Sequence, residues 1–463
     1  LEMADIPLLP QIQARSLVPL FFEDENPWIS VAYTETYYPR FHYGWSELKG
    51  IQDEKFKLII SPKPELYDLE NDPDEEENLA LTHEEDLRRL ESLAARFIEE
   101  TSENAFQLDY RKMDEETRQK LAALGYIGSF TDSSSLEGKT LASPKDKIGV
   151  FNRLSRAREL GLEGEFEQAV TMIDEIIKED PDIIDAYFAL GNLYFKQNKF
   201  EEAQEAFFEV LDRKPDDVFT IINITNSYIR MENLEEAEEF ILSFLPSIPP
   251  DSQVNLILGN IYNSQKKYEK AIQSYRECIE LNPSSATAYN ALGGVYIVQD
   301  NIEEAERYLR KASELNPKLW NVHYNFAQLH EKKGNLLDAV DEYKRELDNI
   351  PHNFRASFNL SRVYRLLGKE EEELHYLNKT IEINPRFPVS YFYKARIHLN
   401  RGEKYEEAIS LVKKGIELNP EKKDLPLGYF LLADLYNRIG NQSLSLEYAK
   451  KGQALIREES DNR

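Results

Sequence analysis

The sequence predicts a mainly α-helical solenoid, and three features that recur along its last two-thirds support this prediction. Prolines occur every 34 residues from Pro181 to Pro385. Alanines keep the same spacing from Ala169 to Ala339, each twelve residues before a proline. A Leu-Gly-x-x-Tyr motif recurs in the same register, for example at Leu190–Tyr194. An internal period of this length is typical of stacked helical repeats, so we expect a solenoid of stacked helix pairs.

Each repeat is predicted to contain two helices and a stop. In residues 184–217, Leu190 and its apolar neighbours lie on one face of a first amphipathic helix. The second helix presents Phe207 on its apolar face, and the small residue Gly191 is expected where the two helices cross most closely. Pro215 ends the second helix because proline has no amide hydrogen and disfavours helix in the residue before it.

This pattern resembles the tetratricopeptide repeat, a helix-pair module that binds other proteins. In one unit the family's marker positions hold Tyr187, Leu190, Gly191, Tyr194, Ala203, Phe207 and Pro215. Units are predicted near residues 150, 184, 218, 252, 286, 320, 354, 388 and 426. The resemblance implies a right-handed superhelix of about nine repeats over residues 147–457, a tail at 458–463, and a protein or peptide ligand in the groove.

The first 149 residues lack this period and suggest a small α+β segment. β-forming residues bounded by Pro and Gly predict short strands at 28–33, 56–60 and 65–69. Thr82 and Glu85 predict a capping box for a helix that runs to about Glu100, and Asp114 predicts the cap of another helix. Residues 128–146 are rich in Ser and Gly, which predicts a flexible linker.

Several motifs before residue 127 follow one another in a recognisable order. They are Arg15–Leu20, Glu35–Trp45, Phe56–Ile59, Pro64–Pro73, Asn78–Ala80 and Leu121–Tyr126. Together they resemble the C-terminal subdomain of a sulfatase, and the last resembles the junction in bacterial sulfatases fused to tetratricopeptide repeats. Each short motif also has a purely structural explanation, since a Leu-Tyr-Asp-Leu strand followed by Asn-Asp-Pro is an ordinary strand and turn.

The resemblance implies chemistry for which these residues lack the groups. Sulfatases share a Cys- or Ser-x-Pro-x-Arg motif whose first residue becomes formylglycine, and carboxylates that bind calcium, and neither is recognisable here. We therefore expect no cofactor in this chain, with calcium and formylglycine implied only for a full-length sulfatase. Because the chain starts at Leu1 rather than Met, the catalytic domain is expected upstream.

Two functional interpretations remain open. The chain is either an interaction scaffold that forms the non-catalytic half of a sulfatase-like protein, or part of an active sulfuric ester hydrolase. The compartment is expected to be periplasmic or extracellular if the parent is an exported sulfatase, and cytoplasmic otherwise. The sequence gives no indication of the oligomeric state.

Charge and hydropathy restrict the partners. The formal charge of −28 disfavours nucleic acid and anionic membrane surfaces, which attract positive proteins. The sequence contains no run of about 18 apolar residues, so we expect no transmembrane helix. The seven histidines show no metal-ligand spacing.

A row of polar side chains is predicted to face the groove. The helical step places the residue two after each Leu marker on the concave side. These places hold Arg158, Asn192, Asn226, Asn260, Gly294, Gln328, Arg362, Arg396 and Asp434. Amides carry both donors and acceptors, so we interpret those in the row as candidate contacts to a peptide backbone. In the alternative interpretation, they bond only to neighbouring helices or water.

Four basic residues form a local concentration of positive charge, named here the arginine cluster: Arg355, Arg362, Arg365 and Arg396. Arg362 and Arg365 share a helix face, and Arg396 occupies the place of Arg362 one unit later. A guanidinium group suits a carboxylate or a sulfate. The amides expected to continue the contact are Asn325, Gln328 and Asn359. Alternatively, the arginines pair only with the acidic run Glu370–Glu373.

The sulfatase resemblance also suggests candidates for the rim of a substrate pocket in an intact enzyme. They are Arg40, His42, Tyr43 and Trp45. The alternative is an aromatic cluster that fills a small core, since Trp and Tyr bury large areas.

The purified chain should not hydrolyse an aryl sulfate, because it lacks the nucleophile motif and the metal ligands on which sulfatase chemistry depends. Release of the chromogenic phenol is compared with a buffer blank and with heat-denatured protein. Turnover that is well above the blank and lost on denaturation would contradict this expectation.

Overall fold

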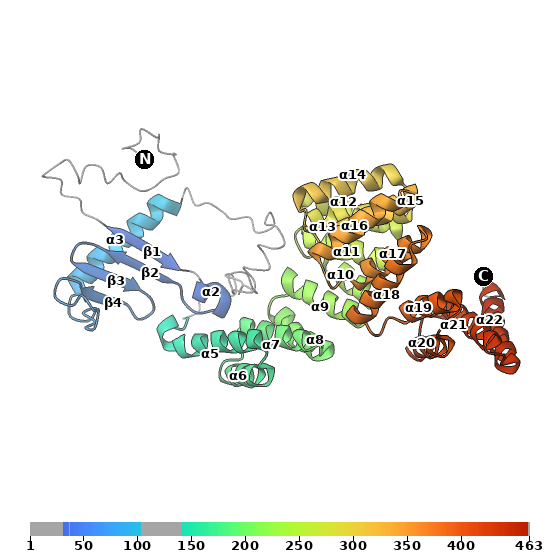
Figure 1. Cartoon of the computed structure of the whole chain (residues 1–463). Helices are drawn as coiled ribbons and strands as arrows, with labels where there is room; N and C mark the ends of the chain where they lie inside the picture. Colours follow the sequence, from blue (N-terminus) through green and yellow to red (C-terminus); the bar gives the residue numbers. More distant parts are fainter. Residues whose placement is uncertain (1–30, 37, 103–140, 462–463) are drawn as a thin grey trace. The chain divides into compact units, whose positions relative to one another are not determined.

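The computed structural model describes residues 31–36, 38–102 and 141–461 (Figure 1). The described residues form two compact units, one ending at Pro249 and the other beginning at Pro250. The first unit contains a small sheet and helix pairs, and the second contains helix pairs alone.

A four-stranded antiparallel sheet opens the first unit, with its strands in chain order. The strands are β1 (Ala32–Thr36), β2 (Leu48–Gln52), β3 (Phe56–Ile60) and β4 (Glu65–Asp68). The register pairs Ile51 with Leu58 and Leu58 with Leu66, so all three side chains lie on one face. Helix α3 (Glu84–Ser102) covers this face with Leu90 and Ala94, and the five side chains form a fully buried core.

The strand predictions hold in part. Those at 56–60 and 65–69 are confirmed as β3 and β4. The strand predicted at 28–33 was misplaced, since β1 begins at Ala32, while residues 28–30 lie outside the described residues. The sequence did not predict β2, where Lys49 and Gly50 interrupt the apolar pattern.

The helix predicted after Thr82 is confirmed as α3, but its capping box was wrong. The Thr82 hydroxyl donates to the Leu79 carbonyl at 3.2 Å instead of capping the helix amides. The helix predicted after Asp114 lies outside the described residues.

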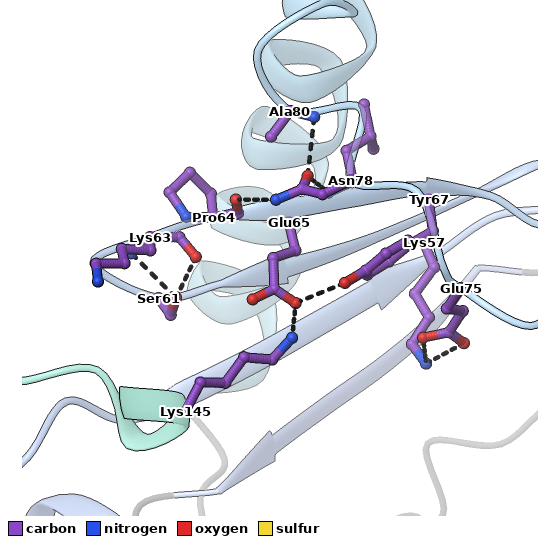
Figure 2. Close-up of polar contacts among 11 residues, drawn as sticks. Lys57, Ser61, Lys63, Pro64, Glu65, Tyr67, Glu75, Asn78, Ala80 and Lys145 are labelled. Atoms are coloured by element: carbon purple, nitrogen blue, oxygen red, sulfur yellow. Dashed lines mark hydrogen bonds and ion pairs between the residues drawn. The ribbon is translucent and has the colours of Figure 1, made fainter. Parts of the chain in front are cut away.

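Polar contacts join the sheet to the first solenoid helix, α5 (Pro144–Glu163), as Figure 2 shows. Glu65 on β4 is buried, accepts a hydrogen bond from the Tyr67 hydroxyl at 2.8 Å, and forms an ion pair with Lys145 of α5. Asn78 Oδ1 accepts from the backbone amide of Leu66 at 3.0 Å and so ties the next segment to β4. These partners offset the cost of burying the Glu65 carboxylate.

Nine helix pairs follow within the described part of the chain (Figure 1). In the first unit they are α5 with α6 (Phe166–Glu179), α7 (Ile184–Lys196) with α8 (Phe200–Arg213), and α9 (Val218–Arg230) with α10 (Leu234–Phe244). In the second unit they are α11 (Ser252–Ser264) with α12 (Tyr268–Leu281), α13 (Ala286–Val298) with α14 (Ile302–Leu315), α15 (Val322–Lys333) with α16 (Leu336–Asn349), α17 (Phe354–Leu366) with α18 (Glu370–Ile383), α19 (Pro388–Arg401) with α20 (Tyr405–Glu417), and α21 (Leu425–Arg438) with α22 (Gln442–Asp461).

Most first helices begin where the 34-residue period places them, at residues 184, 218, 252, 286, 354 and 388. Helix α5 begins at Pro144 rather than near residue 150, so the last three residues of the predicted linker 128–146 are helical. Proline is suited to a first helical turn because its missing amide would have no partner there. Residues 128–140 of that linker lie outside the described residues.

The periodic prolines end the second helices through the residue before them. Asp180, before Pro181, has φ −144° and ψ 88°, and Asn384, before Pro385, has φ −132° and ψ 88°. Both are extended, as the steric demand of the proline ring requires. Helix α10 has only 11 residues because the additional Pro246 follows its last turn.

A glycine allows the two helices of a pair to approach closely, as predicted for Gly191. A Cβ atom at Gly191 would lie 2.5 Å from the ring of Phe207, and one at Gly259 would lie 2.4 Å from the ring of Tyr275. Both rings are fully buried. The predicted close crossing at Gly191 is therefore confirmed.

Two adjacent glycines in α13 provide a test of this packing. A Cβ at Gly293 would lie 2.7 Å from Leu309, whereas one at Gly294 would meet its nearest atom, on Asn325, at 3.5 Å. Gly293→Ala should therefore lower the free energy of unfolding by about 1–3 kcal/mol relative to Gly294→Ala. The comparison cancels the helix-propensity gain of about 1 kcal/mol that both alanines bring. Urea unfolding measures the difference, and equal midpoints would contradict the packing.

Candidate functional site

The predicted polar row lies on the first helices of the pairs. In the first unit, Asn192 of α7 accepts a hydrogen bond from Asn223 at 3.4 Å, and Asn226 of α9 is half-buried. In the second unit, Asn260 of α11 is exposed and accepts a hydrogen bond from the Tyr275 hydroxyl at 2.8 Å. Two of these three amides thus bond to neighbouring helices, as the alternative interpretation held.

The other predicted amides gather around Tyr324, a residue that the sequence interpretation missed. Asn359 Nδ2 donates to the Tyr324 hydroxyl at 2.9 Å, and Gln328 Nε2 donates to it at 3.3 Å. Burial raises the pKa of Tyr324. Asn325 instead bonds to Asn290 on α13 at 2.9 Å. The sequence did contain a signal for Tyr324. It stands one place before Asn325, on a helix face that carries other predicted contacts.

These amides also position an arginine. Arg362 Nη1 donates to Asn359 Oδ1 at 3.1 Å, while the amide nitrogen of Asn359 is held by Tyr324. Asn359 is buried, so its orientation is fixed by both bonds. The chain from Tyr324 through Asn359 to Arg362 thus crosses from α15 to α17.

Two members of the arginine cluster contact one aromatic ring. The guanidinium carbons of Arg365 and Arg396 lie 4.9 and 4.5 Å from the ring centroid of Tyr393, which is cation–π geometry. Arg396 also forms an ion pair with Glu373 at 2.8 Å. Burial, followed by the nearby charge of Arg365, lowers the pKa of Arg396, and burial raises the pKa of the Glu373 carboxyl.

The acidic run after residue 369 neutralises only part of the cluster. Glu370 and Glu371 both pair with Arg401, each at 2.6 Å, rather than with the arginine cluster. Among the described residues, no carboxylate forms an ion pair with the three α17 arginines: Arg355, Arg362 and Arg365. The alternative of pairing with the acidic run therefore holds for Arg396 alone.

The four candidates for the rim of a substrate pocket do not share one environment. Tyr43 and Trp45 are only 4% exposed and stack at 4.5 Å, and Tyr43 meets Phe151 of α5 edge-on at 6.0 Å. Both belong to the core that contains Leu154, so the structure favours the alternative of a core cluster for them. Arg40 pairs with Glu47 at 2.7 Å, and the side chain of His42 lies outside the described part of the chain.

In the described segments, the His, Cys, Asp and Glu side chains do not gather into any group that could bind a metal ion. Among these segments, no helix combines the length and apolar content that a membrane crossing requires. Cys278 is buried in α12.

Family comparisons agree with the repeat geometry. Tetratricopeptide repeat models match residues 184–217, 286–319 and 324–388, and a model described as TPR repeat matches residues 259–300. The chain therefore carries a tetratricopeptide-repeat array. These family matches lie within residues 184–388 and do not bear on the sulfatase resemblance of residues 1–127.

Curated relatives share part of this array. Hsp70-Hsp90 organizing protein 2 of Arabidopsis thaliana is 28% identical over 137 residues, which are 28% of this chain and 24% of that protein. DnaJ homolog subfamily C member 3 of Bos taurus is 29% identical over 91 residues, which are 20% of this chain and 18% of that protein. The chain thus spans a quarter or less of the length of these relatives.

Solved structures are similar in the same way. The Cut9–Hcn1 complex of the APC/C aligns over 81% of this chain and 60% of that chain, with 15% identity and a TM-score of 0.46. A tetratricopeptide repeat protein from Parabacteroides merdae aligns over 57% of this chain and 98% of that chain, with 18% identity and a TM-score of 0.43. At these low scores the likeness adds nothing on function.

Replacing Arg396 should expose the cost of burying Glu373. Arg396→Ala removes the partner of a carboxylate that is 4% exposed, so we expect a loss of about 1–3 kcal/mol in the free energy of unfolding at neutral pH. Burial raises the folded-state pKa of Glu373, and removal of Arg396 should raise it further. The loss should therefore shrink as the pH falls through that pKa and Glu373 becomes neutral.

Arg401→Ala on the same helix is the matched control, because Arg401 pairs with the more exposed Glu370 and Glu371. It should cost less than about 1 kcal/mol. Glu373→Gln added to Arg396→Ala should recover much of the loss. Urea unfolding at several pH values measures all three, and a pH-independent loss in Arg396→Ala would contradict the assignment to Glu373.

Proposed function

We propose that the chain is a protein-interaction scaffold whose second unit binds an acidic peptide segment, or a chain-terminal carboxylate, at the arginine cluster. The observation that carries the proposal is the set of three α17 arginines that form no ion pair with a described carboxylate, in a protein of charge −28. In so acidic a chain, surface arginines usually have acidic neighbours close by. Their lack of such pairs favours a role toward an external anion.

Like charges held close together support this proposal. Arg365 and Arg396 lie over the same Tyr393 ring, and a single carboxylate, Glu373, pairs with one of them. An incoming carboxylate would relieve the repulsion between the two guanidinium groups. It would also accept paired N–H donors in the fork geometry that arginine offers.

The amides act in this proposal mainly as supports. Asn359 holds the guanidinium of Arg362 in place, and Tyr324 holds Asn359. Side chains oriented before binding lose less entropy when the ligand arrives. Gln328 is half-buried beside this network and is proposed to contact the peptide backbone beyond the carboxylate.

The relatives support the general role without identifying a partner. The name of the plant relative refers to organising Hsp70 and Hsp90. The shared region covers 28% of this chain, so the support extends to protein interaction through tetratricopeptide repeats. The partner proposed here is defined by its chemistry, a negatively charged peptide.

A sulfatase-like parent remains a finer proposal, resting on the motif order within residues 1–127. The small antiparallel sheet and α3 give this region an α+β fold, as that proposal requires. An in-frame Cys- or Ser-x-Pro-x-Arg motif upstream in the gene would support it, and its absence there would remove it.

The peptide proposal is tested with the double variant Arg355→Ala and Arg362→Ala. The probe is a fluorescent peptide of alternating Glu and Ser with a free terminal carboxylate, and anisotropy gives its Kd. The variant should weaken binding by about 1.5–3 kcal/mol per lost charged hydrogen bond, less where solvent screens it. Binding should also weaken as salt is added.

The control removes the same charge elsewhere in the second unit. Lys318 and Arg386 are exposed in turns between repeats, and replacing both by Ala changes the net charge equally. This control should bind the peptide nearly as tightly as the parent protein. Equal losses in the two double variants would show a general charge effect and would reject a site at the arginine cluster.

A further inference from the structure

The second unit also contains a cavity, whose lining shares no residue with the arginine cluster. This cavity of about 540 Å³ opens among α14, α15 and α16, and it is named here the histidine pocket. Its charged and titratable lining comes from all three helices. These residues are Glu306, Arg310 and Glu314 of α14, His323, His330 and Lys333 of α15, and Glu342 and Arg345 of α16.

The cavity exists because one repeat departs from its neighbours at aromatic positions. In the preceding repeat Tyr296 stacks on Tyr308 with centroids 5.6 Å apart, and in the following repeat Tyr364 stacks on Tyr376 at the same distance. The 34-residue period puts His330 and Glu342 at these two places in the repeat between them.

A third position changes in the same way. Tyr289 packs beside Tyr308 at 6.1 Å in the preceding repeat, and His323 stands 34 residues after Tyr289. Three places that hold tyrosine in the preceding repeat therefore hold two imidazoles and a carboxylate here. The smaller polar groups leave room where stacked rings fill the space in a neighbouring repeat.

The basic side chains in the pocket outnumber the carboxylates that pair with them. Glu306 accepts from Arg310 at 2.5 Å and also pairs with Lys333, and these two partners hold its pKa down at about 2. Glu342 lies 2.6 Å from His323 Nδ1 and 2.8 Å from Arg345. Each of these two carboxylates thus pairs with two basic side chains.

The third carboxylate does not restore the balance. Glu314 pairs with Lys311 at 3.3 Å, a residue outside the lining. With His323 protonated, four cations therefore face two shared carboxylates. The hydrogen bond that the Glu342 carboxylate accepts from His323 raises the pKa of His323, which favours that protonated state.

We propose that the histidine pocket binds a tetrahedral dianion, the chemistry shared by phosphate and sulfate groups. Arg310 and Lys333 supply donors from one carboxylate-bridged pair, and Arg345 supplies donors from the other. Protonated His323 contributes its positive charge, because its ring already hydrogen-bonds Glu342 and the Pro317 backbone. A dianion matches the excess of two positive charges, whereas a single carboxylate would leave one unbalanced. Its several oxygens can also accept from both pairs at once.

The full chain is titrated with sodium sulfate and, separately, with inorganic phosphate by calorimetry at low ionic strength, with sodium chloride as the reference salt. Both oxyanions should bind saturably. Arg310→Gln should weaken sulfate binding roughly tenfold, the scale of one charged hydrogen bond. Arg307→Gln is the matched control, because Arg307 also lies on α14 and pairs with Glu304 outside the pocket.

A gain of affinity separates binding from a merely structural role. Glu306→Gln removes the internal carboxylate that competes for Arg310 and Lys333, so sulfate should bind several-fold more tightly. Damage to the fold would lower the affinity instead. Weaker or unchanged sulfate binding in Glu306→Gln, or equal affinities in Arg310→Gln and Arg307→Gln, would overturn the proposal.

The pH dependence tests the role of His323. Sulfate keeps its two charges across the range in which histidine titrates, so any change reports the protein. Binding should tighten as the pH falls through the raised pKa of His323, and His323→Gln should remove most of this change. The other titratable groups facing the pocket are His330, with Asp338 at 3.7 Å, and the three glutamates. An unchanged pH profile in His323→Gln would exclude His323 from the site.

The two oxyanions distinguish the source of the ligand. Preference for sulfate over phosphate at equal charge would assign the pocket to sulfate groups, and the reverse would assign it to phosphate groups. Absence of saturable binding of either ion to the parent protein would reject the pocket as an oxyanion site, and leaves the peptide proposal at the arginine cluster untouched.

Discussion

The close crossing of two helices within each pair is the constraint on which the rest of the solenoid depends. At Gly191 and Gly259 a Cβ would approach a buried ring within 2.5 Å, so the ring of the second helix occupies the space that a side chain would take on the first. This contact fixes the distance between the helices and the rotation of each about its axis. Once the rotation is fixed, the face of the first helix that points away from its partner is fixed as well. The positions of the polar residues on the first helix therefore depend on this crossing.

In the arginine cluster, the guanidinium groups are held by aromatic rings and amides more than by carboxylates. Tyr393 lies under two guanidinium groups, and Asn359 orients a third. Rings and amides position a cation without cancelling its charge, whereas a carboxylate such as Glu373 largely neutralises its partner. Rings and amides therefore suit a surface that must attract an anion while its side chains stay ordered. Among the described contacts, Arg362 and Arg365 of α17 are held by an amide and a ring. Arg396 of α19 contacts both a ring and a carboxylate.

The sequence predicted the features that repeat more fully than those that occur once, of which β3, β4 and α3 were predicted and β2 was missed. The prolines, the crossing glycines and the helix starts recur every 34 residues, so each position is supported by several copies. Strand β2 contains Lys49 and Gly50, and it is formed by antiparallel pairing with the two strands beside it, β1 and β3, which its own residues do not encode. The burial of Tyr43 and Trp45 depends on α5, about a hundred residues later in the chain. The amide row was placed on the correct helices, yet its bonds to Tyr324 and Tyr275 arise only from contacts between helices.

The repeat that contains the histidine pocket has lost a stacked tyrosine pair, and a buried carboxylate offers it another source of order. Glu346 of α16 is fully buried and accepts hydrogen bonds from the backbone amides of Asn321 and Tyr324, at 3.1 and 3.2 Å, at the start of α15. It also accepts from Asn353 Nδ2 of the next turn at 2.9 Å. A carboxylate at a helix start satisfies amides that have no partner within the helix and interacts favourably with the helix dipole. Glu346 thus ties α15, α16 and the start of α17 together. Because Glu346 holds these helices in register, the repeat stays ordered without the stacked tyrosine pair. The positions of those tyrosines can then hold titratable groups.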